Sequence, residues 1–432
     1  MNTAATPDPG PGPDSGLRPG PSPSPTDTAA VRRHNLALVL REIAAHGPCA
    51  RTEVAAATGL VHASVTALAA ELIGRGLVAE VGSASSGGRG RPRRLLRLVP
   101  GRVVAIAVQV TLERVEVLAA DLAGEVVHRA SVPHHAPFGD PEPLAAVLAD
   151  AIRRAEEVVR TRPDAHLARV VIAMAGPITG PGHTVAAAID FGWARTDLRA
   201  LVTAHLPDLA CPVDLVNDAN VAALAEYHAR AEQGGELPHT VAYIKADTGV
   251  GGGLVVGGRI HTGTHGLAGE VGHIPLAFDG PDCPCGARGC LAVYVGPEPL
   301  TTAAGLADIA THEGVDAALT ELDHRLRAGD PTATEALTAA GRAVGAAVLA
   351  ITGLVDPAEV ILGGYLATWY PWLTEGINTT LSGRRAVAPH LEPTITAGKL
   401  SEEATLRGAL QTSREATLNT PTQVPHLPPQ AP

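Results

Sequence analysis

The sequence predicts a mainly helical winged helix-turn-helix module followed by a two-lobed α/β domain. Residues 29–98 hold three helical patterns, two short strand patterns and a loop of glycine and arginine. From Val103 the chain follows a strand-strand-helix-strand order that begins again after about residue 213. Both ends are rich in proline and small residues, so we expect them to be disordered. The predicted organisation is a tail (1–28), the winged helix-turn-helix (29–98), the α/β domain (99–412) and a second tail (413–432).

Charge separates the small module from the large domain. Residues 29–98 contain ten arginines, no lysine and four glutamates, although the whole chain carries a net charge of -11. A basic module on an acidic body indicates an anionic partner for the module alone. The N-terminus lacks the apolar stretch of a signal peptide, and no charge-free run of 18 apolar residues predicts a membrane span. Five cysteines, three of them clustered, fit a reducing cytoplasm.

The basic module follows the pattern of a DNA-binding helix-turn-helix. Its first helix ends at Gly47-Pro48, its second spans Arg51–Thr58, and its third runs from His62 to about Arg75. Strands are expected over Leu77–Val81 and Arg94–Val99. The candidate DNA contacts are His62, Ser64 and Thr66 on the third helix and Arg89, Arg91 and Arg93 in the loop between the strands.

Double-stranded operator DNA is the expected partner of this module, with the arginine loop on a phosphate backbone or in a minor groove. The exposed positions of the third helix carry no Arg, Asn or Gln, the side chains that read guanine or adenine through two hydrogen bonds. We therefore expect modest specificity per half-site and a homodimer or homotetramer. The alternative is a three-helix interaction module with a solvated basic loop.

The large domain begins with strands over Val103–Val110, Glu113–Ala120 and Glu125–Ser131. A helix over about Pro141–Arg160 and a buried strand over Arg169–Ala175 complete the first half. The second half holds strands over Val213–Asn217 and His239–Lys245 and a glycine-rich turn over Thr248–Gly253. Two lobes with glycine-rich turns between strands favour a ligand in the cleft between them.

Four residues have the spacing of a zinc site: His273, Cys283, Cys285 and Cys290. One imidazole and three thiolates close a tetrahedral site with no open position, which is typical of structural rather than catalytic zinc. The alternatives are three small apolar residues in a turn, or a Cys-x-Cys redox pair. Cys49 and Cys211 lie apart from this cluster and are expected to be core residues.

These motifs resemble the ROK family, which comprises bacterial sugar kinases and sugar-responsive repressors of the actin-like ATPase fold. The resemblance rests on the zinc spacing, on Ala268–His273, Asn217–Asn220 and Thr248–Gly253, and on Asp356-Pro357 with Gly363-Gly364. The module in front resembles the winged helix of the repressor branch. The resemblance implies that Asp218 is the position of the general base, and that Asn217, Asp218, Glu270 and His273 bind sugar hydroxyls. From the residues alone, Asp218 also fits a helix N-cap and Glu270 a solvated turn acid.

Departures from the family pattern argue against a kinase. Family kinases wrap the ATP phosphates with Asp-x-Gly-Gly-Thr, for which this chain has Ala107–Thr111, without the acid or the glycines. Asp247 adds a negative charge at the second glycine-rich turn, so we expect neither ATP binding nor kinase activity. Ala292 stands where the family has a sugar-binding glutamate, which predicts weaker or altered sugar binding.

The expected function is therefore that of a DNA-binding transcriptional regulator, a repressor of carbohydrate uptake and metabolism genes. A sugar or sugar phosphate in the cleft is the expected effector. The alternatives are an ATP-dependent, glucokinase-like hexose kinase and a regulator without any small ligand.

Overall fold

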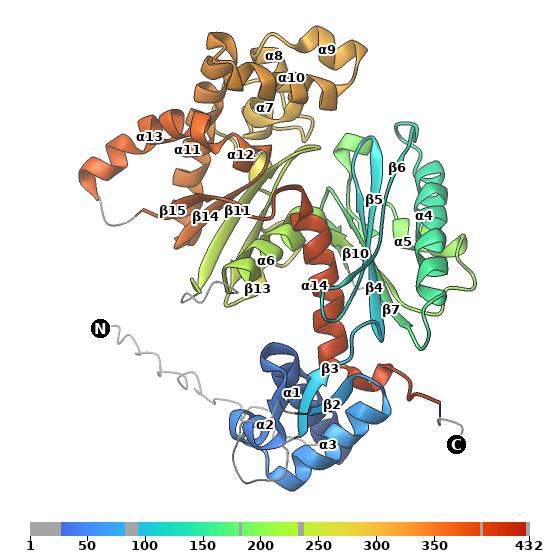
Figure 1. Cartoon of the computed structure of the whole chain (residues 1–432). Helices are drawn as coiled ribbons and strands as arrows, with labels where there is room; N and C mark the ends of the chain where they lie inside the picture. Colours follow the sequence, from blue (N-terminus) through green and yellow to red (C-terminus); the bar gives the residue numbers. More distant parts are fainter. Residues whose placement is uncertain (1–26, 83–93, 181–183, 232–236, 389–391, 429–432) are drawn as a thin grey trace, which may run out of the picture.

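A computed structural model describes residues 27–82, 94–180, 184–231, 237–388 and 392–428. It confirms the predicted fold class: a winged helix-turn-helix lies at one end of a two-lobed α/β body (Figure 1). The predicted N-terminal tail lies outside the described residues. So does the loop with Arg89, Arg91 and Arg93.

The winged helix has the three helices and two strands that the sequence predicts, and it adds a short strand, β1, that the sequence analysis did not predict. Its elements are α1 (Thr28–His46), β1 (Cys49–Ala50), α2 (Arg51–Thr58), α3 (His62–Gly74), β2 (Val78–Gly82) and β3 (Arg94–Leu98). Gly59 ends α2 in the left-handed conformation that glycine adopts without strain, and α2 and α3 then meet at 114°. This angle is typical of a helix-turn-helix. Leu40, Val65 and Leu72 are fully buried in its core.

The first lobe is a mixed five-stranded sheet in the order β10-β7-β4-β5-β6. Its elements are β4 (Val103–Val110), β5 (Arg114–Asp121), β6 (Val126–Pro133), α4 (Glu142–Arg160), β7 (His166–Met174), α5 (Leu198–Ala204) and β10 (Val213–Asn217). The strand pair β8 (Ile178–Thr179) and β9 (Thr184–Val185) lies beside it, followed by the 3-10 turn η1 (Ile189–Phe191). The strand β7 pairs in parallel with both β4 and β10, and its residues 170–174 are buried on both faces of the sheet.

The second lobe is another five-stranded sheet, in the order β13-β12-β11-β14-β15. Its strands are β11 (Thr240–Ala246), β12 (Val250–Val256), β13 (Arg259–Ile260), β14 (Glu359–Gly364) and β15 (Thr394–Ala397). The helix α6 (Asp218–Ala231) connects the two lobes, from the end of β10 toward β11. The remaining elements of this lobe are η2 (Val271–His273), α7 (Ala292–Val295), α8 (Pro297–Ala303), α9 (Ala307–His312), α10 (Val315–Arg327), α11 (Pro331–Val355), α12 (Tyr365–Thr368) and α13 (Tyr370–Val387).

Among the described helices, α11 is the single one long and apolar enough to cross a membrane. It packs against α13, and its residues Leu337, Val344 and Val348 are fully buried in the core of the second lobe. This packing is that of a central helix in a globular domain.

The C-terminal segment corrects the prediction of a disordered tail over 413–432. The helix α14 spans Ala404–Asn419, a 3-10 turn η4 follows over Pro421–Gln423, and the chain is ordered against the winged helix as far as residue 428. Val424 is buried there, and Arg75 donates to its carbonyl oxygen at 2.6 Å. The proline-rich composition was misleading because Leu418 and Val424 of this segment are buried in the core of the winged helix, and Arg75 of the winged helix donates hydrogen bonds to the segment.

Candidate functional site

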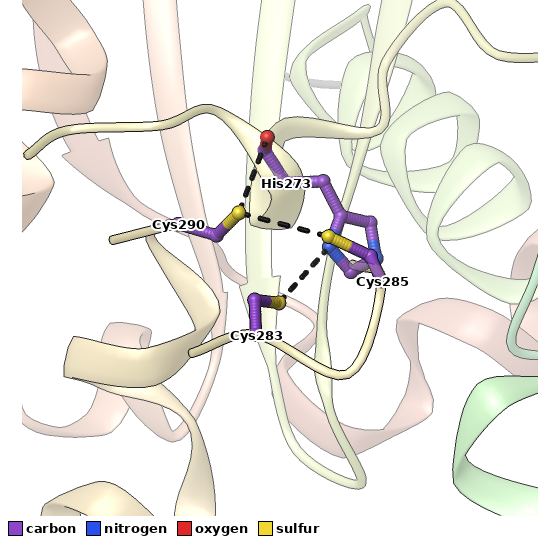
Figure 2. Close-up of side chains that lie close together, drawn as sticks. All are labelled: His273, Cys283, Cys285 and Cys290. Carbon is purple, nitrogen blue, oxygen red and sulfur yellow. Dashed lines mark hydrogen bonds between the residues drawn. The ribbon is translucent and has the colours of Figure 1, made fainter. Parts of the chain in front are cut away.

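The four predicted metal ligands lie together in the loop between β13 and α7. One ligand atom from each of His273, Cys283, Cys285 and Cys290 lies within 4.8 Å of all the others (Figure 2). Cys283 Sγ lies 3.7 Å from His273 Nδ1, and Cys285 Sγ lies 3.8 Å from Cys290 Sγ. Zinc–sulfur bonds of about 2.3 Å in a tetrahedron separate two sulfurs by about 3.8 Å, so the four side chains have the spacing that zinc requires.

Without a cation, protonation in this loop suits a metal at His273 but not at Cys290. Burial lowers the pKa of His273, which keeps its imidazole neutral and able to donate an electron pair to a metal. Burial and the neighbouring thiols raise the pKa of Cys290 to about 12. A bound divalent cation would oppose this shift and favour the thiolate. The donor set and its spacing fit zinc.

Glycines give the ligand loop its shape. Gly289 has a φ of +62°, and a Cβ atom there would lie 2.0 Å from the carbonyl oxygen of Ala277. Backbone pairing between Pro275 and Cys290 closes the loop, directly before α7 begins at Ala292. The alanine that replaces the family's glutamate therefore lies at the start of a helix beside the metal ligands.

The predicted sugar-binding pair Asn217 and Asp218 lies at the junction of β10 and α6. Asn217 Oδ1 accepts the backbone N–H of Asn220 at 2.8 Å, which makes Asn217 the N-cap of α6. Asp218 Oδ1 accepts the N–H of Ala219, and its second oxygen points to β11. The capping role that the sequence left open for Asp218 thus belongs mainly to Asn217.

Lys245 is a functional candidate that the sequence analysis missed. Its ammonium donates to Asp218 Oδ2 at 2.7 Å and lies 2.6 Å from Asp247 Oδ2. Burial alone would lower the pKa of Lys245, but the two carboxylates outweigh burial and raise it above its usual range. A lysine inside the otherwise apolar strand β11 was the available signal, because an unpaired charge is rarely buried.

Two further carboxyl groups, those of Glu270 and Asp190, interact with Asp218. Burial, followed by repulsion from Asp218, raises the pKa of Glu270 to about 7, so Glu270 is more than a solvated turn acid. Burial and repulsion from Asp218 and Asp247 also raise the pKa of Asp190, which the sequence analysis did not single out. Asp190, Asp247 and Glu270 thus all interact electrostatically with Asp218, and Lys245 is paired with Asp218 and Asp247.

The segment expected to replace the phosphate loop, Ala107–Thr111, runs from the second half of β4 into the bend before β5. Ala107 is fully buried inside β4, which has the bounds that the sequence predicts, and the bend to β5 falls at Thr111–Glu113. The bend contains no glycine, and Thr111 uses its own N–H and hydroxyl in bonds with Arg114.

On the winged helix, the predicted contact face of α3 is open. His62 and Thr66 are exposed and Ser64 is half-buried. The Thr66 hydroxyl donates to the carbonyl oxygen of His62 at 2.9 Å and keeps its acceptor lone pairs for a partner.

Comparisons with known proteins agree with this architecture. Residues 105–415 match the ROK family. The kanosamine kinase of Amycolatopsis mediterranei (strain S699) is 33% identical over 269 residues, which cover 61% of this chain and 82% of the kinase. The xylose repressor of Bacillus spizizenii is 24% identical over 359 residues, 83% of this chain and 89% of the repressor. The crystal structure of a ROK family transcriptional regulator, a homologue of the E. coli MLC protein, has a TM-score of 0.74 at 21% identity and covers 91% of this chain and 98% of that one.

The two sheets and the His-Cys loop define a two-lobed, sugar-kinase-like protein that carries a winged helix at its N-terminus. This chain belongs to the ROK family. The match to the xylose repressor covers more of the chain than the match to the kinase, and together with the regulator structure it supports the repressor branch.

Proposed function

We propose that this protein is a DNA-binding transcriptional regulator, a repressor of carbohydrate uptake and metabolism genes whose operator binding is modulated by a sugar. One observation carries the proposal. A winged helix with an open α3 face is attached to a ROK body whose β4–β5 bend contains no glycine. The winged helix is suited to binding DNA. The β4–β5 bend lacks the glycines that let a backbone approach nucleotide phosphates closely.

The DNA-binding surface would consist of His62, Ser64 and Thr66 in the major groove, with Arg89, Arg91 and Arg93 on the phosphates or in the minor groove. Short hydroxyl side chains read bases less selectively than arginine or asparagine. A homodimer or homotetramer that places two winged helices on two half-sites would supply the missing specificity. In this proposal the protein acts in the cytoplasm, on the nucleoid when bound to DNA.

The effector would be a sugar or sugar phosphate held by Asn217, Asp218, Glu270 and His273. Zinc on His273, Cys283, Cys285 and Cys290 would be structural: it would fix the loop that follows Glu270 and so the direction of the Glu270 carboxyl group. Ala292 offers no polar group at the start of α7, so the expected affinity is lower than in relatives with a glutamate there.

The second candidate function is an ATP-dependent hexose kinase. The 33% identity to a kanosamine kinase favours it. Against it, Lys245 already holds the carboxylate of Asp218, the position of the general base, so a sugar hydroxyl would compete with an ammonium for it. The extra carboxylate of Asp247 would also repel a nucleotide phosphate. We therefore propose that the family's catalytic apparatus is vestigial in this chain.

The experiment that tests this proposal is selection of bound sequences from a random duplex library by the full-length, zinc-loaded protein. A recovered inverted repeat, bound at least about 1000-fold more tightly than random DNA, supports the regulator. The Thr66→Ala variant should then lose selectivity while it keeps non-specific binding. Absence of any enriched sequence, together with sugar-dependent ATP consumption, would replace the regulator with the kinase.

A further inference from the structure

Lys245 connects the polar cluster to a second element, the helix α14. Its ammonium donates to Thr405 Oγ1 at 3.1 Å as well as contacting Asp218 and Asp247. An ammonium has three N–H groups, so these three partners satisfy all of them. Lys245 and Thr405 are 4% and 1% exposed, which means that no solvent can replace a lost partner without rearrangement.

The helix α14 extends from this contact to the winged helix. Its first turn, which contains Thr405, lies between the two lobes, and its other end lies against α1 (Figure 1). Sixteen residues of α-helix span about 24 Å. At the far end Arg41 of α1 donates to Glu415 Oε2 at 2.5 Å and to Asn419 Oδ1 at 2.8 Å, and Arg414 donates to the carbonyl oxygen of Ala44 at 3.4 Å.

Two features allow α14 to transmit a displacement. The backbones of α14 and α6 lie in direct contact at Gly408. Any side chain there would collide with α6, since a Cβ atom at Gly408 would lie 1.9 Å from the carbonyl oxygen of Val221. The helix α6 begins at Asp218 and α14 contains Thr405, so each of the two packed helices supplies one hydrogen-bond partner of Lys245. At the far end, an open pocket of about 480 Å³ lies between α1 and α14, so the two helices are not packed together along their whole contact. Leu38, Arg414 and Leu418 line part of it.

We propose that Lys245 is a positioning residue that links the polar cluster to the winged helix through Thr405 and α14. This inference rests on the proposed function and adds the route by which a sugar reaches the DNA-binding module. A sugar hydroxyl that donates to Asp218 competes with Lys245 for the carboxylate. Any resulting shift of the ammonium changes its bond to Thr405 at the first turn of α14, and the other end of α14 carries the change to α1.

The test removes one hydroxyl group. Thr405→Val keeps the shape of the side chain but cannot accept the Lys245 hydrogen bond. Thr412→Val makes the same change on the same helix, at a residue whose hydroxyl bonds only the local carbonyl of Gly408 among its described contacts. Affinity for the selected DNA would be measured by fluorescence anisotropy with and without saturating glucose or xylose, and sugar affinity by calorimetry.

In the unmodified chain, the active sugar should change DNA affinity by about 5- to 150-fold, the usual range of allosteric coupling. Thr405→Val should bind both sugar and DNA within about 3-fold of the unmodified chain, yet the sugar should alter its DNA affinity by less than about 2-fold. Thr412→Val should keep the full coupling. Unchanged coupling in Thr405→Val would overturn the inference.

If neither sugar changes the DNA affinity of the unmodified chain, that result counts against the proposed function alone. A second measurement then tests the inference. Hydrogen exchange without any ligand should then be compared for Thr405→Val, Lys245→Met and Thr412→Val. Faster exchange in α1 (residues 28–46) in the first two variants, and not in the third, supports the link. Faster exchange confined to the first turn of α14 contradicts it.

Discussion

Arg102 is expected to hold the winged helix on the body. Its guanidinium, 7% exposed, donates to three backbone carbonyl oxygens from three segments: Arg75 at 3.0 Å, Asp164 at 2.6 Å and Pro425 at 2.8 Å. Hydrogen bonds from a charged donor contribute about 1.5–3 kcal/mol each, and they are not additive. The Arg102→Met variant keeps the aliphatic stem and loses all three hydrogen bonds, so we expect about 3–5 kcal/mol less docking free energy, because bonds from one side chain contribute less than their sum.

Differential scanning calorimetry would measure this loss. For a module of the size of the winged helix, about 3 kcal/mol should lower its melting transition by about 12–24 °C. Hydrogen exchange should rise over residues 27–82 and over the C-terminal segment that ends at residue 428. Arg97→Met, an exposed position on β3, is the matched control. The reasoning is refuted if Arg102→Met melts within about 2 °C of this control.

Three further predictions concern the body. Cys283→Ser should abolish stoichiometric zinc, measured by elemental analysis of the purified protein, and lower its melting temperature; retention of one zinc per chain would exclude the proposed ligand set. Burial and the nearby Asp316 raise the pKa of Glu113 above its usual value of 4.5. Protonated Glu113 therefore contributes its full share of the folding free energy below pH 4.5, and this share is lost as the pH rises through the pKa of the folded protein. Glu113→Gln should therefore be more stable than the unmodified chain to urea at pH 8 but not at pH 4, and equal stability at both would contradict the assignment. Glu226 is fully buried and accepts the N–H groups of residues 399 and 400, so Glu226→Ala should cost about 3–5 kcal/mol in urea unfolding; a loss below about 1 kcal/mol would count against it.

Local signals explain what could be predicted from the sequence. The second helix, Arg51–Thr58, was predicted with its observed bounds because Pro48 and Gly59 limit it on both sides. The four candidate metal ligands were found because they lie within eighteen consecutive residues, 273–290, and their spacing alone predicts a shared centre. In these cases the chemistry lies close together along the chain.

Contacts distant in the sequence were not predictable. Lys245 meets Asp218 across 27 residues and Thr405 across 160, and nothing near any of the three indicates the pairing. The C-terminal segment appeared disordered because its core is supplied by the winged helix.

The most direct test of the central claim is titration of the selected operator DNA with the full-length, zinc-loaded protein at fixed salt, with and without a panel of sugars. The account predicts tight binding that one sugar weakens by at least about 5-fold. Tight binding that no sugar changes would contradict the proposed control by an effector and leave a regulator without a small ligand. Binding no tighter than to random DNA would contradict the regulator itself.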